Sequence, residues 1–376
     1  MSEDRDLVEL LRRAPLVDGH NDLLWQLRLQ ASYDLDRLDV SQPCPTLHTD
    51  LPRLRAGGLG AQFWSVYVPS DLPGHEAVTA TLEQLDGFHR LVARYPRDLA
   101  LAGTAADVER AVADGRIASM AGIEGGHSIG GSLGALRMMY ALGARYMTLT
   151  HNHTTSWADS ATDDERHGGL TPFGVQVVHE MNALGMLVDL SHVAPATMRA
   201  ALAATRAPVI FSHSSARALC DHPRNVPDDV LAELARNGGV CMVTFVPQFV
   251  SPPVAAASLE LAALERGWAL EHLDDPAAVA ALAERWQAEH PVPRATLAQV
   301  ADHVEHVRAV AGVEHVGIGG DFDGVDQLPD GLGDVAAYPA LFAELRRRGW
   351  SDTELVALAG RNLLRVLRDA EQVAAA

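Results

Sequence analysis

The segment LVDGHNDLLWQL, residues 16–27, begins like a buried strand and then continues with His20, Asn21 and Asp22. A strand in a protein core gains no stability from a histidine and a carboxylate two positions apart. In an extended segment, residues two apart point to the same side, so we expect His20 and Asp22 to aim at one point. An imidazole nitrogen and a carboxylate oxygen suit zinc or another borderline divalent metal.

Other apolar runs also end in side chains that can bind a metal or transfer a proton. These side chains are Glu124, His151, His192, His213, Asp321 and Asp323. Scattered surface residues would not fall so regularly just past the apolar part of successive runs.

Five of these potential ligands are too many for one tetrahedral zinc with an open position. They suit two metals that share a bridging carboxylate, a pair that can hold a hydroxide and polarise a carbonyl group. All 30 basic residues are arginine, so no carboxylated lysine is available as the bridge, and Glu124 is the natural candidate.

The elements that must position these residues are eight apolar runs separated by helical patterns. The runs cover residues 15–20, 61–68, 117–125, 145–151, 185–192, 207–213, 238–245 and 315–324. Continuous apolar runs alternating with helices predict a parallel sheet buried on both faces. Eight strands predict an α/β fold of the (β/α)8 TIM-barrel type, whose active site lies at the carboxyl ends of the strands. An open doubly wound sheet is the alternative.

The stretch 251–296 interrupts this alternation because it is rich in alanine and helical in pattern. We interpret it as a helical insertion between strands 7 and 8, on the site face or the rim, or as a mobile lid. The chain has no internal repeat and no interdomain linker, so we expect residues 1–376 to form a single barrel domain.

The composition narrows the partners of this chain. A formal net charge of −19 argues against nucleic acid and anionic membranes as partners. The chain has no secretory signal pattern and no long apolar run, and its three cysteines suggest a reduced compartment. We therefore expect a cytoplasmic protein that does not bind a membrane.

Several motifs together resemble the membrane (renal) dipeptidases, a family of zinc metallopeptidases. The matching segments are VDGHNDLLWQL, GIEGGHSIGGSLGALRMMYALGARYMTLTHN, LVDLSHV, FSHSSARAL, HPRNVPDDVL and HVGIGGDFDGV. The resemblance covers most of residues 16–368 and is weakest over 251–296. It implies a binuclear zinc dipeptidase on a (β/α)8 barrel, in a homodimer. Family members often tolerate a D-residue at the C-terminal position of the dipeptide.

By motif position, the resemblance implies two Zn²⁺ ions per chain. His20, Asp22 and Glu124 would hold one ion, and Glu124, His192 and His213 would hold the other. The expected reaction is attack on the peptide carbonyl by a hydroxide that bridges the two metals.

The resemblance also assigns three residues to substrate and catalysis. His151 would contact the substrate near the scissile carbonyl, Arg224 would bind the substrate carboxylate, and Asp321 would shuttle the proton. Each has an alternative: a structural role for His151, an ion pair with Asp228 for Arg224, and Asp323 in place of Asp321. Strand alternation predicts that Asp321 and Asp323 point the same way.

Two other functions stay open from the residues alone. One is a different binuclear hydrolase on the same barrel, acting on phosphoesters, lactones or cyclic amides, because a fold does not determine the substrate. The other is a metal-binding or carrier protein without catalysis, which would have no need of a proton-shuttling carboxylate.

Overall fold

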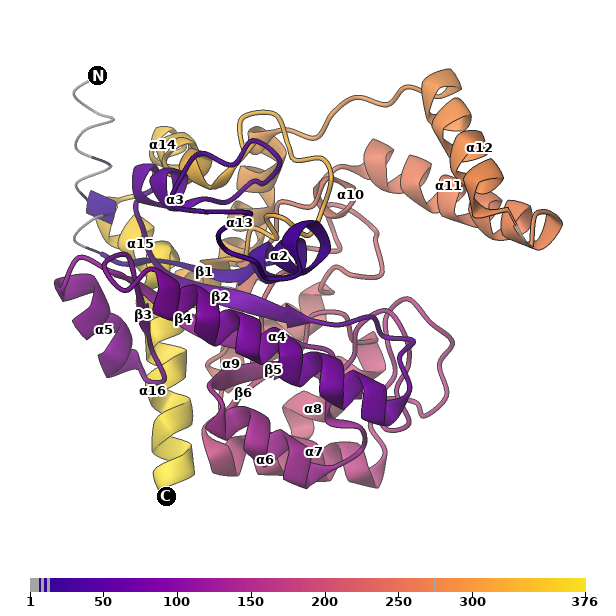
Figure 1. The fold of residues 1–376 in the computed structure, drawn as a ribbon. Helices are drawn as coiled ribbons and strands as arrows, with labels where there is room; N and C mark the ends of the chain where they lie inside the picture. The colour runs from indigo at the N-terminus through magenta and orange to yellow at the C-terminus, as the bar shows by residue number, and fades with distance from the viewer. Residues whose placement is uncertain (1–6, 8–9, 12–13, 274) are drawn as a thin grey trace.

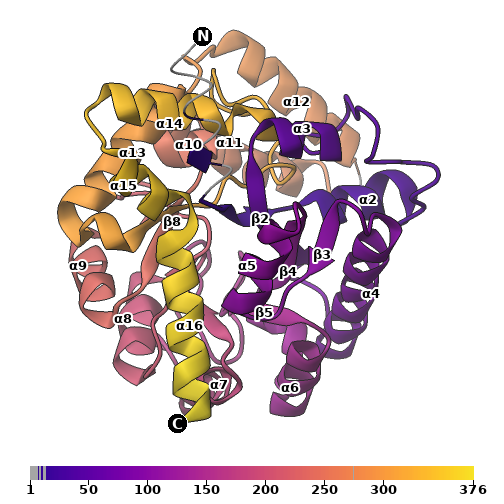
Figure 2. The ribbon, with the colours of Figure 1, turned by 90° about the vertical axis from the view of Figure 1, so that its left-hand side faces the viewer.

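A computed structural model of the chain describes residue 7 and residues 10–11, 14–273 and 275–376. Its centre is one sheet of parallel strands with helices around it (Figures 1 and 2). The strands are β1 Leu16–Asn21, β2 Leu59–Tyr67, β3 Leu99–Leu101, β4 Ile117–Glu124, β5 Ala144–Thr148, β6 Leu187–Asp189, β7 Ile210–Phe211, β8 Val240–Val243 and β9 Val316–Ile318.

A pairing between β2 and β4 closes the sheet into a barrel. The strands follow the order β2-β1-β9-β8-β7-β6-β5-β4-β3, and β2 also pairs with β4 along seven residues, from Ala61↔Ala118 to Tyr67↔Glu124. The closed ring contains eight parallel strands, so the predicted (β/α)8 TIM barrel is confirmed.

The ninth strand, β3, is absent from the sequence prediction. It pairs with the first residues of β4, on the side where β5 pairs only with Ala121–Ile123. Three residues are too few to show a hydrophobic period, and Leu101 at the end of β3 is exposed. The short strand therefore extends the sheet locally without entering the ring.

The predicted strands are longer than the observed ones near the site. Within run 207–213 the strand is only β7, and within run 315–324 it is only β9, followed by an isolated bridge from Phe322 to Asn21. The residues beyond β9 leave the extended conformation, with φ of 62° at Asp321 and 67° at Asp323. The prediction that strand alternation points these two carboxylates the same way was therefore wrong.

The helices that surround the ring follow the predicted rhythm. They are α2 Leu23–Ala31, α3 Leu51–Ala56, α4 Gly74–Arg94, α5 Ala105–Ala113, α6 Leu133–Ala141, α7 Pro172–Leu184, α8 Pro195–Ala204, α9 Asp228–Asn237, α10 Pro247–Val250, α11 Pro252–Glu271, α12 Pro276–Glu289, α13 Leu297–Ala311, α14 Tyr338–Arg347, α15 Asp352–Val356 and α16 Asn362–Ala375. Proline opens α7 and α8, where its missing N–H has no intrahelical partner to lose.

Alternating strand residues separate the packing inside the ring from the packing beneath the helices. Phe63 and Tyr146 pack together with a ring distance of 5.0 Å, in the cluster that includes Met120 and Met242. Trp64, the next residue along β2, packs in the larger cluster that reaches the surrounding helices. The interior aromatic residues thus fill the barrel below the carboxyl ends of the strands.

Helices α11 and α12 form an arm, residues 252–289, that projects from the barrel between β8 and β9 (Figure 1, orange). Only Ala255 in α11 and Ala283 in α12 are buried. None of the described helices has both the length and the apolar character that a membrane-spanning helix needs.

Candidate active site

The five predicted metal ligands lie at the carboxyl ends of the barrel strands. His20 is in β1, Asp22 directly follows β1, and Glu124 is the last residue of β4. His192 and His213 follow β6 and β7 by three and two residues. All five are buried. Asp22 occupies the N-cap position of α2 without a capping hydrogen bond from its side chain, and its backbone is not extended. Tertiary packing rather than strand alternation therefore brings it to His20.

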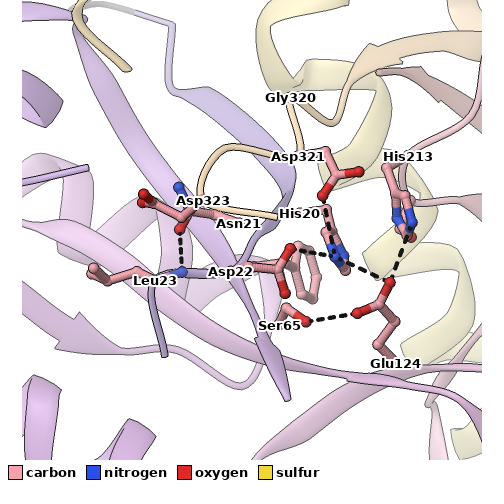
Figure 3. A network of polar contacts seen from close by, with 12 residues as sticks. His20, Asn21, Asp22, Leu23, Ser65, Glu124, His213, Gly320, Asp321 and Asp323 are labelled. Carbon is pink, nitrogen blue, oxygen red and sulfur yellow. Dashed lines mark hydrogen bonds and ion pairs between the residues drawn. The ribbon is translucent and has the colours of Figure 1, made fainter. Parts of the chain in front are cut away.

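One oxygen of Glu124 is the centre of this cluster. The Nε2 atoms of His192, His20, His213 and His151 lie 3.0, 3.5, 3.5 and 3.7 Å from Oε1 of Glu124. The second carboxylate oxygen, Oε2, accepts a hydrogen bond of 3.2 Å from Ser65. Figure 3 shows Glu124 facing His20 and His213.

Two further carboxylates complete the cluster around His20. Nε2 of His20 lies 3.3 Å from Asp22 and 4.0 Å from Asp321 (Figure 3). The structure therefore brings all five predicted ligands together with His151 and Asp321.

The donor set fits divalent metal ions. Three overlapping groups offer ligand atoms within 4.8 Å of one another: His20, Glu124 and His213; Glu124, His151 and His192; and His20, Asp22 and Asp321. Nε2 of His20 is buried without a hydrogen-bond partner. Nε2 of His192 and Nε2 of His213 face each other at 3.0 Å. Converging imidazole nitrogens and carboxylates of this kind are the ligands of zinc and related metals.

Burial controls the protonation of the histidines on one side of the cluster. Burial, helped by the positive charge of Arg224, holds the pKa of His192 well below its usual value. For His213, burial and the nearby His20 act in the same direction and hold the pKa well below its usual value. Both rings are therefore neutral at neutral pH, which is the state that ligates a metal.

Hydrogen bonds on the outer nitrogens fix the orientation of two rings. Tyr146 Oη lies 2.8 Å from Nδ1 of His20, and Ser212 Oγ lies 2.8 Å from Nδ1 of His213. Ser212 also donates to the buried carboxylate of Asp189 at 2.5 Å. Contacts of this kind select the tautomer and hold the ligating nitrogen in place. Asp189 therefore acts as a structural partner of Ser212.

His151 lies against the cluster rather than in a separate polar loop. Its ring is 4.3 Å from the ring of His192 and 4.9 Å from that of Tyr67. Burial lowers the pKa of His151 to about 4. The neighbouring His153 hydrogen-bonds to Ser70 at an exposed position instead.

Arg224 is a buried cation whose guanidinium contacts only neutral groups. Its two terminal nitrogens lie 3.5 Å from Ser214 Oγ and 3.3 Å from the carbonyl oxygen of His213. No carboxylate within the described part of the chain lies within 4.0 Å of it, and the alternative partner Asp228 pairs with His306 at 2.8 Å. A buried charge without an opposite charge is costly, and an anionic ligand would offset that cost.

The two carboxylates after β9 have different surroundings. Asp321 points to His20, whereas Asp323 accepts a hydrogen bond of 2.6 Å from the backbone N–H of His48 (Figure 3 shows the two carboxylates apart). Burial raises the pKa of Asp323 to about 6. Burial also raises the pKa of Asp321, well above its usual value, and the charges of Asp22 and Glu124 act in the same direction.

Sequence reasoning missed Tyr67 and Tyr146 because it searched strand ends only for histidine and acids. Tyr67 is the last residue of β2 and pairs in register with Glu124. Burial raises its pKa to about 12, so its hydroxyl stays protonated. A tyrosine at the strand-end position was the available signal. No local signal identifies Tyr146, whose hydroxyl reaches His20 across the barrel.

A TIM barrel with clustered histidines and carboxylates at the carboxyl ends of its strands defines a class, the metal-dependent hydrolase barrels. Similarity of the whole chain to known proteins identifies the family within this class. The family model of the membrane dipeptidases (peptidase family M19) matches residues 5–376, so the chain belongs to that family and is a metallodipeptidase-type hydrolase.

Relatives and solved structures agree with this membership. The chain is 43% identical to dipeptidase aclJ of Aspergillus oryzae over 379 residues, which cover 98% of this chain and 81% of the relative. A probable dipeptidase PvdM from Pseudomonas aeruginosa has a similar fold, with a TM-score of 0.86 at 24% identity over 98% of each chain. A metallopeptidase from Rhodobacter sphaeroides, liganded with a phosphinate mimic of L-Ala-D-Ala, has a TM-score of 0.77 at 25% identity over 95% of this chain and 99% of that one.

Proposed function

We propose that this protein hydrolyses dipeptides with two Zn²⁺ ions at the cluster around Glu124. The observation that carries the proposal is the convergence of four imidazole nitrogens on one oxygen of Glu124. His20 and Asp22 would hold one ion and His192 and His213 the other, with Glu124 shared. When bound, a metal pair lowers the pKa of water and polarises a carbonyl group.

The residues around the cluster would act on the two ends of the scissile bond. Nε2 of His151 faces the cluster, and the neutral ring can donate a hydrogen bond to the substrate carbonyl oxygen. Asp321 can take a proton and give it to the leaving amine, because its carboxylate faces the cluster and burial raises its pKa, which favours the protonated form.

Arg224 would select substrates by their carboxylate. Its guanidinium can form two parallel hydrogen bonds to a carboxylate, which fixes both the position and the orientation of the C-terminal residue. A free carboxylate directly beside the scissile bond occurs in a dipeptide, and this requirement would exclude longer peptides.

The substrates proposed here include dipeptides with a C-terminal D-residue. The Rhodobacter metallopeptidase carries a phosphinate mimic of L-Ala-D-Ala, and its fold is shared along 95% of this chain. Arg224 and Asp321 contact the carboxylate and the amine in this proposal, and neither group differs in chemistry between the two enantiomers.

Amino-acid release from a library of L-L and L-D dipeptides tests the proposed function. The zinc-loaded protein should cleave dipeptides and leave matched tripeptides and C-terminal amides intact, because both controls lack the carboxylate at the required position. No cleavage of any dipeptide by protein with two zinc ions per chain would contradict the proposal. Lactones and phosphoesters would then be the next substrates to assay.

A further inference from the structure

A pocket of about 590 Å³ lies where the arm leaves the barrel. Its walls come from α10, from the first half of α11, from the end of α12 and from the loop after β9; they include Gln248, Val254, Leu261, Trp286, Gly324 and Val325. The volume falls within the range of small-molecule sites. Figure 1 shows the tip of the arm projecting beyond this base.

Gly324 connects this pocket to the metal-ligand cluster. It lines the pocket, and a methyl group at its Cα would lie 2.4 Å from Oδ2 of Asp22 and 2.4 Å from Oδ1 of Asp321. Gly324 therefore forms part of the pocket wall and packs directly against these two carboxylates.

Another part of the pocket wall is next in the chain to a residue that contacts Arg224. Gln248 lines the pocket, and the next residue, Phe249, has its ring 5.1 Å from the guanidinium carbon of Arg224. Neither Arg224 nor Asp321 lines the pocket itself, but its wall includes a glycine that packs against Asp321 and a residue next in the chain to a contact of Arg224. The proposed function assigns these two groups to the C-terminal residue of a dipeptide.

We propose that this pocket holds the side chain of the C-terminal residue and favours large, uncharged, mainly apolar side chains. The inference rests on the proposed dipeptidase function. In a C-terminal residue, the leaving nitrogen, the carboxylate and the side chain are attached to one carbon atom. When the nitrogen faces Asp321 and the carboxylate faces Arg224, the side chain of one of the two configurations extends toward the pocket, whose wall adjoins contacts of both groups.

The lining chemistry determines the preferred side chain. Val254, Leu261, Trp286 and Val325 supply apolar surface. The ionisable groups of the lining are Asp326 and His290, and the lining contains no arginine. An acidic side chain would therefore find a carboxylate and no permanent cation, whereas leucine or phenylalanine would bury apolar area against Trp286.

Truncating Trp286 tests the pocket with dipeptides of the series Ala-Gly, Ala-Ala, Ala-Leu, Ala-Phe and Ala-Asp, in the configuration of the C-terminal residue that the wild type cleaves faster. Trp286→Ala should lower kcat/KM about tenfold for Ala-Leu and Ala-Phe and leave Ala-Gly unchanged, because only the large side chains reach the ring. Trp268→Ala is the matched control, since Trp268 lies in the same arm and does not line the pocket.

A large side chain introduced into the pocket lining also tests the assignment of the pocket to the C-terminal side chain. Ser258→Trp, in the lining, should lower kcat/KM for Ala-Phe while Ala-Gly is still cleaved, and Ala269→Trp, on an exposed part of α11, should change neither. Equal losses across the series, or equal effects of the lining and control variants, would overturn the pocket assignment. Absence of cleavage by the zinc-loaded wild type would instead overturn the dipeptidase proposal on which it rests.

Discussion

At the scale of single residues, the environment of each polar group determines its part in the chemistry. Asp321 and Asp323 are the same residue type two positions apart, yet Asp321 faces His20 and Asp323 accepts a hydrogen bond from His48. Their roles differ because the backbone turns between them and not because the side chains differ.

Replacing Asp321 by asparagine should separate metal binding from proton transfer. Asp321→Asn keeps the size of the side chain but removes the group that carries the proton, so we expect kcat to fall by about 10²–10⁴-fold. Zinc content, measured by elemental analysis, should stay unchanged. Asp323→Asn is the matched control and should keep most of the activity, because its oxygen can still accept from His48. Equal activity loss in both variants would contradict the assignment.

Replacing Arg224 by lysine should weaken substrate binding even though the charge is kept. A lysine offers a point charge in place of the planar fork, so we expect kcat/KM for dipeptides to fall about tenfold or more, mainly through KM. Arg217→Lys removes a surface arginine that pairs with Asp221 and should have no effect. Steady-state kinetics with one dipeptide would show the difference, and an unchanged KM in Arg224→Lys would exclude the clamp.

At the scale of elements, the loops that follow the strands position the reacting groups. The loop after β9 carries Asp321, Asp323 and Gly324, and Gly324 packs directly against the carboxylates of Asp22 and Asp321. The loop after β7 carries Arg224 and is tied to α13, because the N–H of Ala216 donates to Nδ1 of His303 at 3.0 Å.

A methyl group at position 324 should disturb the metal site while the fold is kept. In Gly324→Ala, the new Cβ would lie 2.4 Å from one oxygen each of Asp22 and Asp321, so both must move. We expect zinc affinity, measured by competition with a chelator, to weaken by about 10–100-fold. Gly333→Ala, where nothing lies within 4 Å of the added group, is the control. Unchanged zinc affinity would show that the ligands tolerate the shift.

His303 should make the fold lose stability in mild acid. Burial lowers the pKa of His303 from 6.5 to about 4, and the contact of Nε2 with the carbonyl oxygen of Val250 offsets only part of this effect. In the folded state the neutral ring accepts a hydrogen bond at Nδ1 from the N–H of Ala216. Between pH 6.5 and 4 the unfolded chain binds the proton and the folded chain does not. Its contribution is therefore complete above pH 6.5 and is lost as the pH falls toward 4.

Urea unfolding of wild type and His303→Gln at several pH values measures this contribution. Glutamine can make both hydrogen bonds without titrating, so the stability of the wild type should fall by about 3 kcal/mol more than that of the variant between pH 6.5 and 4. Parallel pH profiles for the two proteins would show that His303 is not the titrating group.

At the scale of the whole molecule, the barrel gathers charges that are costly without a ligand. Glu124, Asp22 and Asp321 are buried beside His20 at the carboxyl end of the barrel. Metal binding would offset this repulsion and would act only on the folded chain. The stability of the fold should therefore depend on metal.

Removing metal should lower the melting temperature of the protein. A ligand present at about 1,000 times its Kd stabilises the folded state by about 4 kcal/mol. We expect treatment with a chelator to lower Tm by several degrees and zinc to restore it. Calorimetry of the chelated and reloaded protein makes the comparison, with Mg²⁺, a poor match for imidazole ligands, as the control ion. Equal Tm values before and after chelation would argue against a metal at the cluster.

The predicted homodimer and the predicted single domain also belong to this scale. Light scattering coupled to size exclusion measures the mass in solution, and a homodimer would have twice the chain mass of 40.3 kDa.

Limited proteolysis should leave one resistant core if residues 1–376 form one domain. A monomeric mass or two resistant fragments would contradict these predictions.

The sequence by itself determined the barrel class and the candidate ligands. A buried strand is apolar along its length, and polar residues begin where the segment leaves the core. This pattern is written in each segment separately, so the sequence showed four candidate ligands at the ends of apolar runs: His20, Glu124, His192 and His213. The resemblance to the family motifs added Arg224 as a candidate and favoured Asp321 over Asp323 as the proton-shuttling carboxylate.

Only the tertiary structure decided how far each strand pairs and which groups meet across the barrel. Three contacts join residues far apart in the chain: the pairing of β2 with β4, the hydrogen bond between Tyr146 and His20, and the packing of Gly324 against the carboxylates of Asp22 and Asp321. Such contacts depend on the register of strands and the course of loops, which the spacing of residues along one segment does not encode.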